Sequence, residues 1–521
     1  MNKKLYLIIL CLASAQLYAQ TAQDALRMSW VTPSGTARNQ AIGGAMGSLG
    51  GEITSLFVNP AGLGFYKNSE LVFTPGFRWT KTKGSFRESD YMTLNNTNSF
   101  NFGTTGYVGG WSDKYSKWKS KAFSIGVNRT ANFNQDIFYS GTNNFSSFSE
   151  QFAEEFAASG LPINAQLDNA PLTLGTKLAN YTYLIDTVTA NGVTQVVGLP
   201  FRDAILDNSE VHFQQDKHIQ TTGGITEVAL GFAANMDDKL YIGGSLGVPI
   251  VNYSRHSVIS EQDLSGKNNN NFNNAIYTED FTSSGIGINA KLGLIFKPAE
   301  FWRVGAAIHT PTLYGLKEKT EGNLVTDLEN YFPPGQNIRQ ANTETIYGSA
   351  GAPEFKYDLV TPWKFIVSGS YVFREAEDIT RQKGFITADI EYTNYKWSKF
   401  SNAEETNDES YYNGINNDID NAFKSAFNFK VGGELKFKVI MARLGFAYYG
   451  NPYNNQALKA NHMYASGGLG YRNKGIFLDL TYSHQINKDV NFPYRLGDKA
   501  NTYAQLKEAG GSIMLTLGIK I

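Results

Sequence analysis

Residue types that could do chemistry are present, but few stand in a catalytic or metal-binding spacing. Residues 243–247 (GGSLG) match G-x-S-x-G, in which a nucleophilic serine sits on a strand-to-helix turn. Here the match lies inside an alternating, strand-like segment, so we read it as strand sequence. The six histidines include no H-E-x-x-H, and the acidic run that begins at Asp418 and Asp420 breaks at Ala422. We therefore expect no enzyme, no metal site and no cofactor.

Composition narrows the class of protein. The chain has 521 residues, of which 18 % are charged and 13 % aromatic, with 51 glycines and a net charge of -1. Typical globular chains carry roughly 25 % charged residues, so this chain is short of charge. Its aromatic content argues against disorder. A near-neutral balance gives no electrostatic reason to expect nucleic acid as a partner.

Residues 1–19 resemble a secretory signal peptide, with two early lysines followed by an apolar run at 5–12. We expect cleavage after Ala19, with Ala15 as the alternative. Cleavage removes two lysines and Cys11, the one cysteine of the chain, so the mature charge becomes -1 - 2 = -3. The mature chain then has no thiol for a disulfide or a thiolate metal site. No other segment has 18 consecutive apolar residues, so we expect no membrane-spanning helix.

Period-two alternation favours a β-barrel over a soluble exported protein. From residue 512 to 521 the odd positions are apolar and the even ones are mostly polar or glycine, and 427–439 and 240–250 alternate in the same way. About ten residues of such alternation are typical of a membrane-spanning strand. We count about fourteen such stretches, near 69–79, 99–111, 119–134, 219–236, 238–258, 278–298, 301–321, 354–374, 383–397, 421–438, 440–450, 459–473, 475–488 and 507–521.

The connections between these stretches are alternately short and long. Residues 237–238 form a short connection, whereas 135–218 and 322–353 form long ones. This parity is typical of an outer-membrane barrel with tight periplasmic turns and large external loops, and an even strand count puts both chain ends in the periplasm. A secreted sandwich or propeller, the soluble alternative, should show regular spacing. The predicted fold is an all-β, transmembrane, antiparallel barrel over residues 68–521, with 135–218 as its longest loop.

The segment before the first strand, residues 20–67, is rich in Gly, Ala and Ser, and it is suited either to a periplasmic tail or to filling the lumen as a hatch. Within it, 34–38 (SGTAR), 43–45 (GGA) and 57–63 (FVNPAGL) resemble the amino-terminal hatch of the FadL/TodX family of outer-membrane transporters. Residues 309–312 (HTPT) and 361–363 (TPW) are similar to the family's Thr-Pro signatures, whereas Ile521 departs from the usual terminal aromatic.

The resemblance implies a fourteen-stranded barrel with a hatch, placed in the cell outer membrane. It also implies passive uptake of long-chain fatty acids or similar hydrophobic compounds, through hatch rearrangement and lateral exit through the barrel wall. The implied partners are a hydrophobic small molecule and outer-membrane lipid, and we favour a monomer. A structural or secretion-associated barrel of the same family that binds partner proteins is the main alternative. A phospholipase-like barrel and a haem-uptake role are weaker ones.

The resemblance also implies a gate. In the family, the triplet that matches Asn59, Pro60 and Ala61 contacts an inward kink of the third strand. Pro60 would stiffen this loop, Asn59 would bridge unpaired backbone groups, and Gly62 follows the triplet. Gly126 is our candidate for the kink, since glycine tolerates irregular backbone, although it could equally be an ordinary small strand residue.

Two sets of residues are candidates for the ligand path. Phe145, Phe148, Phe152 and Phe156 have helical spacing within the longest predicted loop. Their apolar face would form a capture groove, or else pack on the core of the loop itself. Lys291 and Arg303 are the best lumen-side candidates for holding a fatty-acid carboxylate, the alternative being that they pair with other charges.

Overall fold

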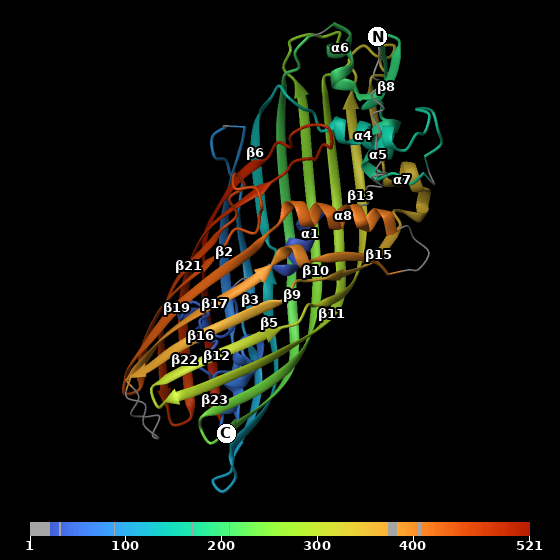
Figure 1. Cartoon of the computed structure of the whole chain (residues 1–521). Helices are drawn as coiled ribbons and strands as arrows, with labels where there is room; N and C mark the ends of the chain where they lie inside the picture. The colour runs from blue at the N-terminus through green and yellow to red at the C-terminus, as the bar shows by residue number, and fades with distance from the viewer. Residues whose placement is uncertain are drawn as a thin grey trace, which may run out of the picture.

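The structure, a computed structural model, is a closed antiparallel β-barrel that describes residues 21–30, 33–87, 89–167, 170–207, 209–373, 383–403 and 409–521 (Figure 1). In this described part the wall has fourteen strands, and the first strand pairs with the last to close it. The predicted fold class is confirmed. The predicted signal peptide lies outside the described residues. None of the described helices is long and apolar enough to cross a membrane.

Several wall strands consist of two consecutive segments. In chain order the wall is β1 and β2 (Glu70–Phe73, Pro75–Phe86), β3 and β4 (Asn96–Phe102, Thr105–Ser112), β5 and β6 (Trp118–Asn132, Gln135–Asn143), β9 (Phe213–Met236), β10 (Leu240–Asp263), β11 (Asn274–Ala299), β12 and β13 (Trp302–His309, Leu313–Asp327), β15 and β16 (Glu354–Val360, Lys364–Phe373), β17 and β18 (Gly384–Asn394, Lys399–Asn402), β19 (Ser425–Phe437), β20 (Ile440–Tyr449), β21 (His462–Asn473), β22 (Ile476–Asn491) and β23 (Ala504–Lys520).

The remaining elements belong to the amino-terminal segment and to the long loops. They are α1 (Ala22–Ser29), α2 (Ala37–Ala41), α3 (Ser55–Val58), η1 (Pro60–Phe65), α4 (Ser149–Ala158), α5 (Leu174–Tyr181), β7 (Ile185–Ala190), β8 (Val193–Gly198), α6 (Leu199–Asp207), β14 (Ile338–Asn342), α7 (Thr343–Tyr347), η2 (Gly348–Ala350), η4 (Tyr395–Trp397) and α8 (Glu409–Ala422).

Each of the fourteen predicted stretches overlaps one wall strand, but the boundaries of the longest loop were wrong. The third strand continues after a break at 133–134 into β6 and ends at Asn143, and the fourth strand already begins at Phe213. The longest loop is therefore 144–212 rather than 135–218. The sequence hides this because polar residues occupy both faces of these strands where they extend beyond the apolar part of the wall.

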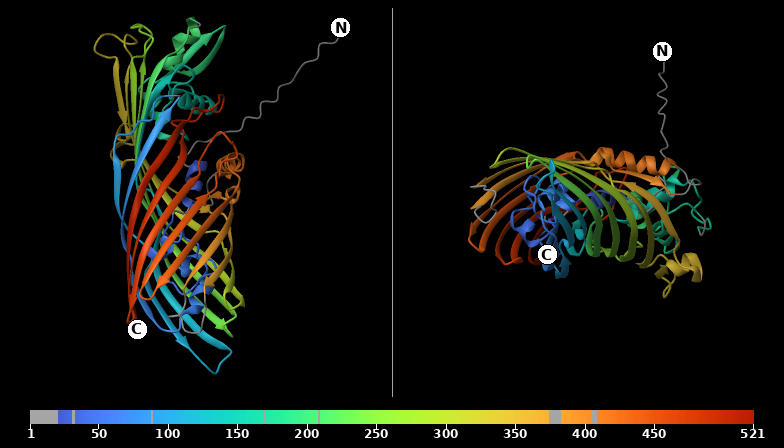
Figure 2. Two further views of the ribbon diagram at one scale, coloured as in Figure 1. Left: turned by 90° about the vertical axis from the view of Figure 1, so that its left-hand side faces the viewer. Right: turned by 90° about the horizontal axis from the view of Figure 1, so that it is seen from below.

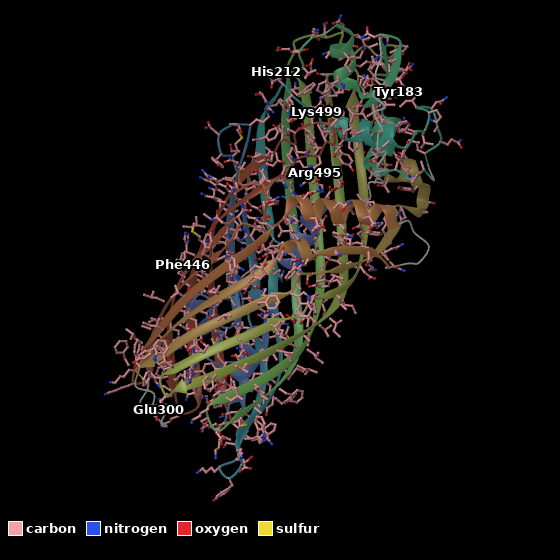
Figure 3. All side chains as sticks on the ribbon, viewed as in Figure 1. Tyr183, His212, Glu300, Phe446, Arg495 and Lys499 are labelled. Atoms are coloured by element: carbon pink, nitrogen blue, oxygen red, sulfur yellow. The ribbon has the colours of Figure 1, made fainter. Side chains whose placement is uncertain are left out.

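The outward face of the wall changes from apolar to polar along each long strand. On β9, the outward side chains Leu230 and Phe232 are exposed and apolar, whereas Gln220 and Thr222, further along, are polar. Since a tilted strand of about 9–11 residues crosses a bilayer, this apolar belt marks the membrane-spanning part. The rest protrudes on the side of the long loops, as Phe446 in the belt and His212 near the far end show (Figure 3).

The two Thr-Pro segments lie at breaks in the wall strands. Pro311 and Pro362 have no N–H to donate to a ladder. Thr310 Oγ1 instead accepts the N–H of Ala290 at 2.9 Å, and Thr361 Oγ1 accepts that of Thr312 at 2.8 Å. These threonine hydroxyls therefore satisfy wall N–H groups where the ladder is interrupted, so the strand can bend without leaving these donors unpaired.

Residues 21–30 and 33–66 lie inside the barrel (Figure 2), and we refer to 33–66 as the hatch. The helix α2 contacts β20 to β23, and η1 contacts β5 and β9 to β11. Most of the hatch is irregular, so its backbone carbonyls have no ladder of their own. Wall hydroxyls donate to them instead: Thr481 Oγ1 to Ala37 O and Ser120 Oγ to Gly64 O, both at 2.6 Å.

Glycines on the inner face of the wall let the hatch backbone approach closely. A Cβ added to Gly445 of β20 would lie 2.1 Å from the nitrogen of Gly43 and 2.2 Å from the carbonyl carbon of Ile42. These are backbone atoms and cannot turn aside as a flexible side chain would. Only glycine therefore fits at Gly445 while the hatch is seated.

Gly445→Ala should unseat the hatch locally and lower the free energy of unfolding by about 1–3 kcal/mol, the usual cost of overpacking. Thermal unfolding of the purified barrel, together with proteolysis of the hatch, measures this effect. Gly369→Ala is the matched control, because a Cβ at Gly369 meets nothing within 4 Å. Equal stability of the two variants would show that the close approach does not constrain the hatch.

Candidate functional site

A cavity of about 1100 Å³ lies between the hatch and the external loops. Its floor is α1, its walls include the inner faces of β9, β10, β11, β21 and β22, and its roof is α4, α5 and the segment 489–495. The wall positions that line it, such as Lys217 of β9, lie beyond the apolar belt. The cavity is therefore on the long-loop side of the membrane-spanning part.

The floor is fixed by polar and aromatic contacts of α1. Thr21 and Asp24 form a capping box at its start, and Asp24 forms an ion pair with Arg27. The Arg27 guanidinium lies 4.4 Å from the ring centroid of Tyr253, and Trp30 stacks on His462 at 4.2 Å. These contacts tie the helix to β10 and β21, so the amino-terminal segment supplies the floor of the site.

Most charged groups at the cavity have a partner. Arg255 donates to Glu279 at 2.6 Å, and Arg78 donates to Gln485 at 2.7 Å. Lys217 differs, because it is buried, lines the cavity and has no ion-pair or hydrogen-bond partner among the described residues. Burial lowers the pKa of its amine to about 8, an effect that Glu279 partly offsets. The site therefore holds one buried amine that is available to an anionic group.

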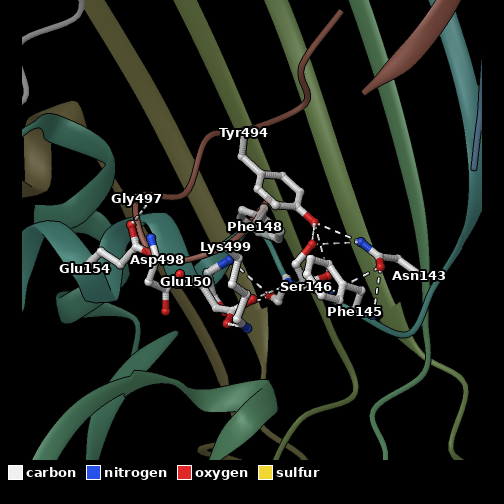
Figure 4. Close-up of polar contacts among 12 residues, drawn as sticks. Asn143, Phe145, Ser146, Phe148, Glu150, Glu154, Tyr494, Gly497, Asp498 and Lys499 are labelled. Carbon is white, nitrogen blue, oxygen red and sulfur yellow. Dashed lines mark hydrogen bonds and ion pairs between the residues drawn. The ribbon is translucent and has the colours of Figure 1, made fainter. Parts of the chain in front are cut away.

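The roof is fastened to the wall and to the segment 494–499 by polar contacts (Figure 4). The Asn143 amide donates to the hydroxyl of Tyr494 at 2.9 Å, and Lys499 forms an ion pair with Glu150 on α4. The Glu154 carboxylate accepts the N–H of Gly497 at 2.7 Å. The loop after β22 and the helix α4 thus form one cover over the cavity.

The four predicted phenylalanines do not form one external groove. Phe148 and Phe156 are fully buried in the core of the loop, as the alternative interpretation expected. Phe152 packs in the same core but also lines the cavity. Phe145 is 43 % exposed, beside Lys499. Of the four, only Phe152 is placed where a bound molecule could touch it.

The two predicted cations are engaged elsewhere. Lys291 forms an ion pair with Glu227 and donates to Asn289 at 2.7 Å. Arg303 donates to the carbonyl of Leu49 in the hatch at 2.5 Å and lies over the ring of Phe65. Neither residue lines the cavity, so the structure places both in contacts that hold the lumen together.

Lys217 was missed because the predicted fourth strand began at residue 219, which left Lys217 in the loop. One signal could have found it. Phe213, Gln215, Lys217, Ile219 and Thr221 alternate with polar residues and continue the inward phase of the strand. Continuing the same alternation back to Phe213 would have placed the amine of Lys217 on the inner face. Among the described residues, no cluster of His, Cys, Asp or Glu is arranged to hold a metal ion.

Comparison with known proteins finds matches among solved structures only. No protein-family model matches the chain, and neither does any curated protein. A FadL homologue from Pseudomonas aeruginosa aligns over 94 % of this chain and 99 % of its own, with 12 % identity and a TM-score of 0.51. A deltaS2 mutant of the monoaromatic hydrocarbon channel TodX aligns over 93 % and 98 %, with 12 % identity and the same score of 0.51. This chain has the FadL fold.

Within the FadL fold, the implied gate residues take other positions than expected. The Asn59 amide donates to Gly47 O at 2.6 Å and lies 3.3 Å from the carbonyl oxygens of Leu294 on β11 and Ala306 on β12. A Cβ at Gly243 of β10 would touch the backbone of Pro60 and Ala61. The triplet therefore packs on β10 to β12, not on a kink of the third strand. Gly62 closes a turn by donating to Asn59 O at 2.9 Å.

The third strand in this FadL fold is irregular on either side of Gly126 but regular at Gly126 itself. Gly126 is paired on both sides, with Gly106 and Ala229, and its Cα faces Leu56 of the hatch. The register against β9 shifts between Trp118 and Ser120 and again between Arg129 and Ala131, and not at Gly126, so the kink prediction at Gly126 was wrong. Glycine at 126 is explained by close packing on the hatch instead.

The titration of Glu154 should make the stability of the cover depend on pH. Burial, with Asp498 beside it, raises the pKa of Glu154 to about 7. Such a carboxyl binds its proton more tightly in the folded state than in the unfolded state. The stabilisation that the bound proton gives to the cover is therefore lost as the pH rises through 7. We expect the amides of Gly497 and Asp498 to exchange faster at pH 8 than at pH 5, after correction for intrinsic rates. Hydrogen-exchange mass spectrometry measures this.

Glu154→Gln keeps a similar shape and removes the titration, so the two pH values should give equal protection. Lys499 and Glu150 remain in place in this variant and control for other titrations at the same contact. Glu300→Gln, at the opposite end of the barrel (Figure 3), should behave like the parent chain. The same pH dependence in Glu154→Gln would assign the effect to another group.

Proposed function

We propose that this protein is an outer-membrane channel for passive uptake of a hydrophobic small molecule, and that a long-chain fatty acid is its ligand. Support comes from the FadL fold, whose solved examples include a channel named for monoaromatic hydrocarbons. The outward apolar belt fits a bilayer, and the short turns and the carboxyl end of the chain lie on one side of it, whereas Thr21, the first described residue, lines the cavity on the long-loop side. The function does not follow from the fold alone, so the site must carry it.

The observation that carries the proposal is the cavity with Lys217 in it. Ligand pockets are mostly apolar, with a few polar groups that fix orientation. Aromatic and aliphatic side chains such as Phe152, Ile219 and Tyr277 line this cavity, and Lys217 supplies the one buried amine without a partner among the described residues. A fatty acid would place its carboxylate on Lys217 and its chain along the apolar lining.

Passage beyond the cavity would require the hatch to move. Hatch side chains and backbone fill the lumen below the cavity, as the contacts of Gly445 and Arg303 illustrate. We propose that the ligand then leaves sideways between β3 and β5. The β4–β5 ladder ends at Thr105 and Val127, and among the described residues β3 has ladder bonds only to β2. Phe100 of β3 is 57 % exposed, so this unpaired stretch lies in the apolar belt.

Lys217→Met should weaken palmitate binding about tenfold or more, since a charge-assisted hydrogen bond contributes about 1.5–3 kcal/mol. Palmityl alcohol should bind both proteins equally, because it carries no charge. Calorimetric titration with each ligand measures the difference. Binding of palmitate should also weaken as the pH rises through 8 and the amine loses its proton.

Lys267→Met, in an exposed loop, is the control of equal charge change. The proposal fails if Lys217→Met binds palmitate as the parent does, or if acid and alcohol lose affinity alike. The second result would point to altered packing and not to a carboxylate contact. Lipid extraction from the purified parent, followed by mass spectrometry, identifies any acid that it retains.

A disulfide tests whether the hatch must move. The hydroxyls of Ser48 in the hatch and Ser368 in β16 are 2.7 Å apart, so cysteines at both positions are close enough to bond. Ser48→Cys with Ser368→Cys should block fatty-acid uptake by cells when oxidised and restore it on reduction, while palmitate binding persists. Each single cysteine variant is a control. Uptake that continues under oxidising conditions would rule out a rearrangement at this contact.

A further inference from the structure

A row of like charges crosses three neighbouring strands on the outer surface. Lys83 of β2 lies directly opposite Lys507 of β23, which in turn lies opposite Lys488 of β22. All three side chains are exposed and point away from the lumen, and Lys81 lies two residues below Lys83 on the same face. Directly opposed like charges destabilise a sheet. Three in a row therefore need a compensating interaction.

No carboxylate within the described chain compensates this lysine row. Apart from Lys81, its outward neighbours are uncharged, namely Ser85, Asn96, Ile486, Gln505 and Ala509. The acidic residues next to Lys507 and Lys488 in sequence face inward: Glu508 lies within 3.5 Å of Arg78, and Asp489 lines the cavity. The Lys507 ammonium lies 3.7 Å from the ring centroid of Tyr91, which donates to Gln505. The row is therefore a purely cationic surface.

The height of the row on the barrel indicates what covers it. On β22 the outward side chains run from Ile476 to Ile486, and Lys488 follows directly. Further down the same strands, four residues from Lys83 and six from Lys488, Trp79 and Tyr482 stack at 6.0 Å, as aromatic residues do at a membrane interface. The lysines therefore lie where the headgroups of the leaflet on the long-loop side begin.

We propose that this lysine row binds the phosphate groups of a lipid headgroup in the outer leaflet. The ammonium groups of Lys83, Lys507 and Lys488 would contact the phosphates, the Trp79–Tyr482 pair would lie at the base of the headgroup, and the acyl chains would lie along the belt below. The inference rests on the proposed membrane location and is independent of the ligand in the lumen.

The lysine row differs from other lysines at the same height on the wall, because those have carboxylate partners. On β13, Lys317 and Lys319 are also exposed just beyond the belt, but Lys317 pairs with Glu354 at 3.1 Å and Lys319 with Glu321 at 2.6 Å. Those charges are balanced within the protein. The contrast makes the lysine row the surface that needs an external anion.

Native mass spectrometry of the detergent-solubilised barrel with added bisphosphorylated lipid A tests the proposal. The parent should retain the lipid, and Lys83→Gln with Lys488→Gln and Lys507→Gln should lower the bound fraction by about tenfold or more, because each cation contributes near a charged surface. Dephosphorylated lipid A should bind parent and variant equally weakly. Lys→Arg at the same three positions should restore retention.

The control variant Lys317→Gln with Lys319→Gln and Lys399→Gln, the last being the exposed first residue of β18, has the same change of charge and should retain lipid A as the parent does. Inorganic phosphate at equal concentration should not displace the lipid, since it lacks the chains that lie on the belt. Equal loss in the control, unchanged retention in the lysine-row variant, or displacement by inorganic phosphate would each overturn the proposal. Palmitate binding to the lumen should be unchanged throughout, which separates this result from the proposed uptake function.

Discussion

The hatch backbone can stay inside the barrel only because the wall satisfies it. An irregular segment buried in a lumen carries N–H and C=O groups that would otherwise be left without partners, each at a cost of about 1–3 kcal/mol. Serine and threonine hydroxyls on the inner face donate to these carbonyls, as Thr481 does to Ala37. Wall glycines such as Gly445 provide the space that the same backbone occupies. The polar, small-residue inner face of the strands follows from this one requirement.

The need of the hatch backbone for partners also separates what the sequence could predict from what it could not. The strands follow from alternation, because each residue of a wall strand faces either lipid or lumen. The partners inside the lumen do not follow from it. Ala37 meets Thr516, and Gly47 meets Asp389, across hundreds of residues of sequence. Such contacts depend on how the hatch is rotated in the barrel, and no local pattern records that rotation.

The candidate site shows this limit at single residues. Alternation correctly put Lys291 and Arg303 on the inner face. It could not show that Lys291 forms an ion pair with Glu227, or that Arg303 donates to the carbonyl of Leu49. Lys217 lies on the extension of β9, where polar residues occupy both faces of the strand and the alternation weakens. Helical spacing correctly indicated α4, since Phe148, Phe152 and Phe156 share its buried side, but not that only Phe152 reaches the cavity. The family motif was recognisable, yet its packing against β10 to β12 required the structure.

The closure of the barrel bears on how the hatch comes to be held. The last wall strand, β23, pairs with β1 and β2, and its Thr516 hydroxyl accepts the N–H of Ala37. Thr481 of the preceding strand donates to the carbonyl of the same hatch residue. The hatch thus binds to the two wall strands that are furthest from it in the sequence. The hatch can be seated fully only when β22 and β23 are in place, so closing the barrel and holding the hatch depend on the same strands.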